Sequence, residues 1–103
     1  MAARFTLIDA AKADLTDIRS YTRREHGDEQ AKGYMAELRQ GFKTLRTNSE
    51  IGYSIEHIRK HYRCFQVKRH RIIYRLKDEE IVVIAVLHER QLPLRHIAQR
   101  RLD

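Results

Sequence analysis

The sequence predicts an α+β domain, in which a helical hairpin packs on one face of a single twisted sheet. The apolar, largely β-branched run Ile81–Leu87 is typical of a strand that is buried on both faces at the centre of a sheet. Two runs before it alternate between apolar and polar residues, as strands with one buried face do. Upstream, two amphipathic stretches with helical periodicity flank Gly27.

The N-terminal half is expected to form one strand and the helical hairpin. The expected elements are the strand Arg4–Ile8, a helix from Asp9 to about His26 and a helix from Asp28 to about Arg46. Asp9 and Asp28 are suited to cap the helices, because a carboxylate can accept hydrogen bonds from the free amides of a first turn. Gly27 fits the left-handed residue that closes a helix, and so short a junction predicts that the helices fold back on each other.

The C-terminal half is expected to form a three-stranded antiparallel meander and a short final helix. The expected elements are the strands Tyr62–Val67, Arg71–Lys77 and Glu80–His88 and a helix over Leu94–Leu102. Turns are predicted at Lys68-Arg69-His70 and Lys77-Asp78-Glu79. Pro93 suits the first turn of the final helix. Residues 47–61 are irregular and are expected to tuck against the core, and the first strand is the natural second neighbour of the central strand.

Size and composition predict one domain, residues 1–103, with acidic partners. The chain has a formal net charge of +7 and a pI of about 9.9, which favours nucleic acid, an acidic protein or an anionic membrane. The lone Cys64 excludes an internal disulfide, and no apolar run is long enough for a membrane helix, so a cytoplasmic protein is expected. No nucleotide or metal motif is present, and neither a cofactor nor a metal is expected.

A chemical role could be assigned to His88, at the end of the predicted central strand. A histidine can act as a general acid or base, since its free pKa lies near neutrality. Arg63, Arg71 and Arg75 could supply positive charge to a phosphate on the same sheet, and this set would suit RNA cleavage. The alternative is that His88 only ends a strand and that the arginines solvate a face of the sheet.

Several strings resemble the RelE/ParE superfamily of bacterial toxins. They are Tyr62-Arg63-Cys64-Phe65, His70-Arg71-Ile72-Ile73-Tyr74-Arg75 and Ile84-Ala85-Val86-Leu87-His88-Glu89-Arg90. The opening, a short strand followed by Ala10-Ala11-Lys12-Ala13-Asp14-Leu15-Thr16-Asp17-Ile18, is also similar. The resemblance implies a twisted antiparallel sheet with the helix hairpin packed on it. It also implies the toxin half of a type II toxin–antitoxin pair, neutralised by an antitoxin that has a DNA-binding domain.

Two branches of the superfamily differ in activity. ParE-like members inhibit DNA gyrase without known catalytic chemistry, whereas RelE-like members are endoribonucleases that cut messenger RNA on the ribosome. In the RelE-like alternative, Arg63, Arg71, Arg75 and His88 match parts of a catalytic site, and only in that case is the chain an enzyme. Glu89 stands where RelE-like members commonly carry a tyrosine. The resemblance therefore favours the ParE-like branch, and a relative without toxicity is a third alternative.

The ParE-like branch implies two protein partners. The first is a cognate antitoxin, a small acidic ParD-like DNA-binding protein that forms a hetero-oligomeric complex with the toxin. The second is DNA gyrase, while DNA is contacted only indirectly, through the antitoxin. The antitoxin is expected to contact Tyr34, Leu38, Arg63, Arg71 and Arg75. The target-binding surface is expected to comprise His88, Glu89, Arg90, Arg95, Arg100 and Arg101.

Overall fold

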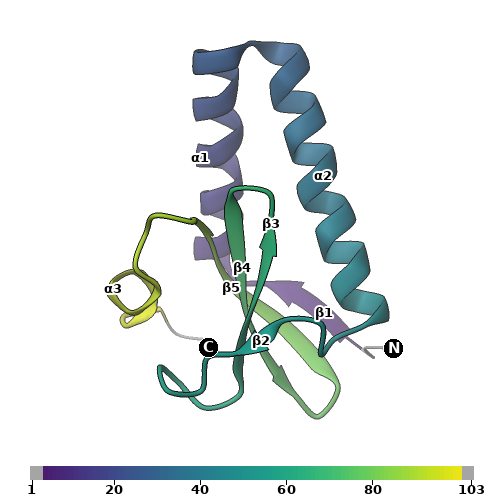
Figure 1. Cartoon of the computed structure of the whole chain (residues 1–103), viewed down its shortest axis with the longest axis vertical. Helices are drawn as coiled ribbons and strands as arrows, with labels where there is room; N and C mark the ends of the chain where they lie inside the picture. Colours follow the sequence, from purple (N-terminus) through teal and green to yellow (C-terminus); the bar gives the residue numbers. More distant parts are fainter. Residues whose placement is uncertain (1–3, 101–103) are drawn as a thin grey trace.

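The computed structural model describes residues 4–100, which form a five-stranded sheet with a helical hairpin on one face (Figure 1). The elements in order are β1 (Arg4–Leu7), α1 (Asp9–His26), α2 (Asp28–Thr47), β2 (Tyr53–Ser54), β3 (Tyr62–Val67), β4 (His70–Lys77), β5 (Glu80–His88) and α3 (Pro93–Ile97). The predicted α+β class and order of elements are confirmed. Within residues 4–100, no helix is both long enough and apolar enough to cross a membrane.

The strand β5 lies inside the sheet, as predicted, between β1 and β4 in the order β1-β5-β4-β3-β2. Every residue from Ile81 to Leu87 is buried. The strands β3, β4 and β5 form the expected antiparallel meander, but β1 runs parallel to β5, with Leu7 opposite Val83. The wholly antiparallel sheet that the resemblance implied is therefore corrected at this edge. A parallel pair needs a long connection, and here the chain from α1 to β4 supplies it.

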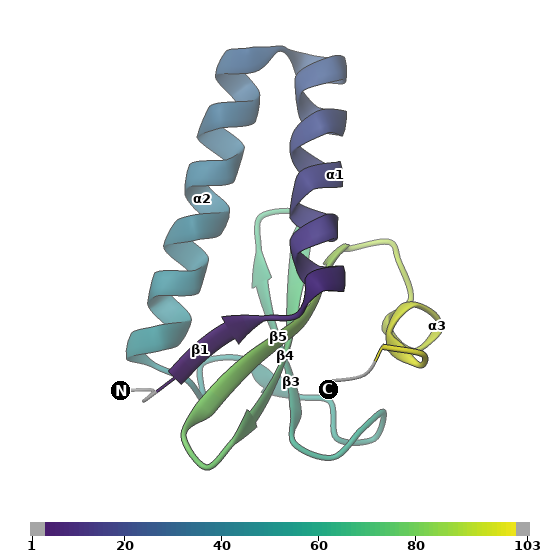
Figure 2. The same cartoon turned by 180° about the vertical axis from the view of Figure 1, so that it is seen from behind.

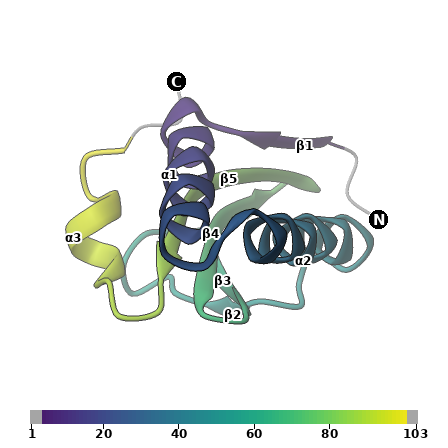
Figure 3. The ribbon, with the colours of Figure 1, turned by 90° about the horizontal axis from the view of Figure 1, so that it is seen from above.

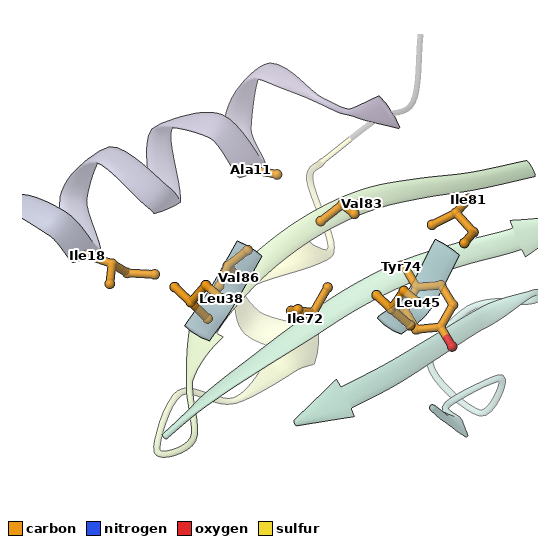
Figure 4. Close-up of a cluster of buried hydrophobic side chains, with 9 residues drawn as sticks. All are labelled: Ala11, Ile18, Leu38, Leu45, Ile72, Tyr74, Ile81, Val83 and Val86. Carbon is orange, nitrogen blue, oxygen red and sulfur yellow. The ribbon is translucent and has the colours of Figure 1, made fainter. Parts of the chain in front are cut away.

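The two faces of β5 pack into separate apolar clusters. The hairpin-side cluster, shown in Figure 4, brings side chains of α1 and α2 against the strands; its buried members are Ala11, Ile18, Leu38, Leu45, Ile72, Tyr74, Ile81, Val83 and Val86. The opposite cluster contains Tyr62, Cys64, Ile73, Ile84 and Ile97 among its buried members. Because Ile97 belongs to α3, this short helix covers part of the face that the hairpin leaves open. In Figure 3, α3 lies beside β5.

The hairpin projects beyond the sheet, and the β3–β4 turn reaches toward the same end of the molecule (Figures 1 and 2). Gly27 joins the helices with φ of 92°, as its predicted conformation requires. The predicted caps at Asp9 and Asp28 are wrong. The cap positions are Ile8 and Gly27, without a side-chain hydrogen bond, and both aspartates already belong to the first helical turns. At these positions their negative charges still interact favourably with the positive end of each helix dipole.

Residues 47–61 and the final helix also differ from the sequence prediction. Residues 47–61 contain the short edge strand β2, which pairs with Arg63 and Cys64 of β3, although Ile55 is buried as expected. Two residues of pairing are too few to give a recognisable alternation. The final helix covers Pro93–Ile97 rather than Leu94–Leu102, with Pro93 in its first turn. The end of the predicted helix, residues 101 and 102, lies outside the described residues.

Candidate functional site

A groove of about 1050 Å³ lies between the projecting part of the hairpin and the end of the sheet. The helices contribute Tyr21 and Tyr34 to its wall. The β3–β4 turn contributes Arg69, and the end of β5 and the residues after it contribute His88 and Arg90. The groove thus combines aromatic residues on its helical side with cations on its sheet side, and it is the natural place to look for a binding site.

Three side chains form a connected cluster inside the groove. The Tyr34 hydroxyl accepts a hydrogen bond from the Arg69 amide at 3.3 Å, which leaves its proton free to bond Nδ1 of His70. The His70 ring packs edge-to-face against both Tyr34 and His88, with ring centroids 5.4 Å apart in each pair. Nδ1 of His88 in turn accepts from the Arg90 amide at 3.2 Å. The cluster therefore links the start of β4 and the end of β5 to α2.

The middle of this cluster is uncharged near neutral pH. Burial, assisted by the neighbouring His88, lowers the pKa of His70 to about 4. Burial also raises the pKa of Tyr34 above its ordinary value, so its hydroxyl keeps its proton. His70 therefore adds no positive charge to the groove near neutral pH, whereas Lys68, Arg69 and Arg90 do.

Two cations of the rim of the groove form weak surface ion pairs. Lys68 lies 3.6 Å from Glu37, and Arg69 lies 3.7 Å from Glu89. Exposed pairs of this kind contribute about 0–1 kcal/mol to stability. They can be exchanged at little cost for carboxylates of a partner protein.

The four residues predicted for RNA cleavage lie on two faces of the sheet. Arg63 stands opposite Tyr74, a member of the hairpin-side cluster, so it lies on the hairpin side. Arg71 and Arg75 lie on the opposite side, while His88 pairs with His70 on the hairpin side. The structure does not bring these four side chains together around one phosphate.

The length of the β3–β4 turn explains this separation. The turn consists of two residues, Lys68 and Arg69, and Val67 pairs with His70. A three-residue turn including His70, as the sequence suggested, would place Arg63 directly opposite Arg75. A shift of one residue in register moves a side chain to the other face of a sheet.

Arg63 and Tyr74 anchor the chain between α2 and β2. The Arg63 guanidinium donates to the carbonyl oxygens of Glu50 and Gly52. The Tyr74 hydroxyl donates to the carbonyl of Ser49 at 2.7 Å and accepts from the Gly52 amide at 3.2 Å. Arg63 therefore has a structural partner in the molecule, which the sequence pattern alone did not indicate.

The residues predicted to contact an antitoxin are dispersed. Tyr34 lines the groove, but Leu38 is only 1% exposed and lies in the core beneath the hairpin. Arg71 and Arg75 are half-buried on the other face of the sheet, where Arg75 lines a second hollow of about 700 Å³ beside β1. Of this set, only Tyr34 belongs to the groove.

The residues predicted to contact the target are placed more favourably. His88 and Arg90 line the groove, Glu89 accepts from the Gln66 amide group, and Arg95 is exposed on α3. Arg100 instead forms an ion pair with Asp14, and Arg101 lies outside the described residues. Two neighbours were missed by the sequence reasoning: Leu92 and Leu94 are 62% and 59% exposed. Their position on either side of a helix-starting proline was the available signal.

Within residues 4–100, no three His, Cys, Asp or Glu side chains gather in a way that could hold a metal ion. The arrangement around the groove is instead one of aromatic rings, exposed cations and nearby exposed leucines. These groups bind protein surfaces well, because rings and aliphatic chains supply apolar area and arginines pair with carboxylates.

Comparison with known proteins identifies the family. The sequence model described as "ParE toxin of type II toxin-antitoxin system, parDE" matches residues 6–93. The chain belongs to the ParE toxin family. It is accordingly a ParE-type toxin of a type II toxin–antitoxin system, as the resemblance in its strand sequences indicated.

Individual relatives agree with this membership. Toxin ParE1 of Mycobacterium tuberculosis is 34% identical over 91 residues, which cover 87% of this chain and 93% of the relative. Toxin ParE1 of Caulobacter vibrioides is 33% identical, with 82% and 88% covered, and toxin ParE of Escherichia coli is 31% identical, with 93% and 94% covered. The fold also matches a chain of the chromosomal ParDE system from P. aeruginosa, with a TM-score of 0.71, 18% identity, and 82% and 94% of the two chains covered.

Proposed function

We propose that this ParE-family chain inhibits DNA gyrase in the cytoplasm and is neutralised by a cognate, acidic, ParD-like antitoxin. The observation that carries the proposal is the match to the ParE branch over residues 6–93, because gyrase inhibition is the activity of that branch. The position of the candidate ribonuclease residues supports the same choice. Arg63 lies on one face of the sheet and Arg71 and Arg75 on the other, so they cannot stabilise one phosphate together.

The proposed gyrase-binding surface extends from the chain after β5 into α3. Leu92 and Leu94 expose most of their apolar surface, and Arg90 and Arg95 are exposed beside them. Exposed apolar side chains next to cations favour contact with a protein partner over simple solvation. Arg100 is not part of this surface, because its guanidinium is occupied by Asp14.

The antitoxin is proposed to insert an acidic, amphipathic segment into the groove. Its apolar face would cover Tyr34 and the His70 ring, and its carboxylates would replace Glu37 and Glu89 as partners of Lys68 and Arg69. A segment that folds on binding can follow such a groove over a long surface.

Neutralisation would follow from overlap between the two surfaces. His88 and Arg90 line the groove and also stand at the start of the proposed gyrase-binding surface. An antitoxin segment in the groove therefore covers residues that gyrase would need.

The gyrase proposal is tested with the purified chain in a supercoiling assay. Leu94→Ser is expected to raise the concentration needed for half-inhibition about tenfold, because losing a central apolar contact typically costs more than about 1 kcal/mol. Ile51→Ser is the matched control, since Ile51 is also an exposed apolar residue but lies near the edge strand β2. Undiminished inhibition by Leu94→Ser would contradict the placement of the surface.

The antitoxin proposal is tested by calorimetric titration with the antitoxin encoded in the same operon. Arg69→Glu is expected to weaken binding by about tenfold or more, because it places like charges across the contact. Arg39→Glu makes the same charge change at an exposed position of α2 that does not line the groove. Equal loss of affinity in both variants would indicate a general charge effect and would refute the groove assignment.

A further inference from the structure

Within residues 4–100, one stretch of β5 has no strand neighbour on its β1 side. The pairing with β1 ends at Val83, whose carbonyl accepts from the Ile8 amide at 3.1 Å. Beyond this point β5 continues, and its register with β4 shifts so that Ile84 is an extra residue. Buried backbone groups on such a stretch need other hydrogen-bond partners.

Two side chains from distant parts of the chain supply these partners. The carboxylate of Asp14, in α1, accepts from the Val86 amide at 2.9 Å. The guanidinium of Arg100, beyond α3, donates to the Ile84 carbonyl at 2.9 Å. The two side chains thus replace the missing strand and attach the C-terminal segment to the core.

Asp14 and Arg100 also bind each other through two parallel hydrogen bonds. Nη1 of Arg100 lies 2.7 Å from Oδ2 of Asp14, and Nη2 lies 3.0 Å from Oδ1. The Asp14 side chain is only 15% exposed, and the Arg100 side chain is only 20% exposed. A bidentate pair shielded from water is stronger than a surface pair, and loss of one partner leaves the other charge poorly solvated. The neighbouring carboxylate accordingly raises the pKa of Arg100.

Other described residues also attach the segment that carries α3. The Gln91 side-chain oxygen accepts from the His88 amide at 2.7 Å, and its amide nitrogen lies 3.5 Å from Nε2 of His96. Ile97 is buried in the opposite cluster, and Arg59 donates to the carbonyls of Ala98 and Arg100 at 3.2 and 3.3 Å. The helix α3 has only five residues, too few to be stable by itself. Its position therefore depends on these contacts and on the pair of Asp14 and Arg100.

We infer that Asp14 is a positioning residue for target binding: through Arg100 it holds the segment that presents Leu92, Leu94 and Arg95 as one ordered surface. This inference rests on the proposed gyrase inhibition. Asp14 itself is too buried to contact a partner through more than a small part of its surface. Its contribution is to remove the ordering cost that a loose segment would incur on binding.

The test compares Asp14→Asn with the wild-type full-length chain. Asparagine keeps an oxygen that can accept from the Val86 amide but loses the charge and the second acceptor for Arg100. Glu25→Gln is the matched control, because it makes the same charge change at an exposed position of the same helix. Hydrogen exchange of residues 93–100 and gyrase inhibition are measured on each chain.

The expected result is exchange in residues 93–100 that is faster by about tenfold or more in Asp14→Asn, since a lost charge-assisted hydrogen bond changes an opening equilibrium by about that factor. Exchange in β4 and β5 should stay at the wild-type rate, and gyrase inhibition should weaken by a similar factor. Arg100→Met should have the same effect, and the double variant should be no worse than either single variant. The Glu25→Gln control should match wild type in both measurements.

Unchanged exchange in residues 93–100 would overturn the inference, as would faster exchange with full inhibition of gyrase. If hydrogen exchange in β4 and β5 is also faster in Asp14→Asn, the deciding variant is Arg100→Lys, which keeps the charge and loses the bidentate geometry. Selective loosening of the segment and weaker inhibition in that variant would support the inference, and wild-type behaviour would overturn it. A wild-type chain without effect on gyrase would refute the proposed function, while the exchange measurement would still decide the attachment.

Discussion

Replacement by alanine is expected to change the stability of the fold in opposite directions at Gly33 and Gly41, two glycines of α2. A Cβ atom built on Gly33 meets no atom within 4 Å. A Cβ atom on Gly41 lies 2.6 Å from Cγ2 of Val67 in β3 and 3.5 Å from Cδ1 of Ile72 in β4. Gly41 is thus the point where α2 approaches the sheet closely, which fixes one side of the hairpin against the strands.

The expected changes in the free energy of unfolding follow from helix propensity and from packing. Alanine is preferred over glycine within a helix by about 0.8–1 kcal/mol, so Gly33→Ala should stabilise the fold by about 1 kcal/mol. Gly41→Ala gains the same term but overpacks the contact with Val67, and overpacking costs about 1–3 kcal/mol. The β-branched side chain of Val67 cannot swing away easily. The net expectation for Gly41→Ala is a destabilisation of about 0–2 kcal/mol.

Urea unfolding followed by circular dichroism measures both values. The decisive control is the background Val67→Ala, which removes the clashing methyl group. In that background Gly41→Ala should become stabilising by about 1 kcal/mol, because only the propensity term remains. If Gly41→Ala stabilises the unmodified chain as much as Gly33→Ala does, then α2 does not lie this close to β3.

Further predictions concern buried polar groups. Tyr74→Phe should destabilise the fold by about 1–3 kcal/mol, because it leaves the Ser49 carbonyl and the Gly52 amide without their partner. Tyr62→Phe, measured in the same urea titration, should be neutral or stabilising, since the buried Tyr62 hydroxyl finds no hydrogen-bond partner among the described residues. The folded-state pKa of His70, about 4, lies below the ordinary value of 6.5, so between these values the unfolded chain holds more protons. The contribution of His70 to stability should therefore be fully present above pH 6.5 and decrease as the pH drops toward 4. This loss of stability should be smaller in His70→Gln. The same pH dependence of stability in His70→Gln and wild type would contradict the burial argument.

The sequence carried enough information for the fold because its strongest patterns concern burial. A strand covered on both faces needs apolar residues at every position, and the short, β-branched run Ile81–Leu87 occupies such a position. Gly27 marked the hairpin because a positive φ favours glycine. These features depend on local sequence and on the periods of helix and strand.

The arrangement of the candidate site was less predictable because it depends on register and on distant contacts. The face on which Arg63 lies is decided by whether the β3–β4 turn has two residues or three, and the basic turn sequence does not distinguish the two lengths. The carboxylate of Asp14 looked like any exposed helical acid, since its partner Arg100 is 86 residues away. The cluster of Tyr34, His70 and His88 likewise combines three elements that only the folded chain brings together.

We propose that this ParE-family toxin acts on gyrase and not on messenger RNA. The direct measurement assays one preparation of the purified chain for gyrase supercoiling and for messenger RNA cleavage on programmed ribosomes. We expect inhibition of supercoiling that the cognate antitoxin reverses, and intact messenger RNA. Cleavage of messenger RNA that is lost in His88→Ala, with supercoiling unaffected, would contradict it.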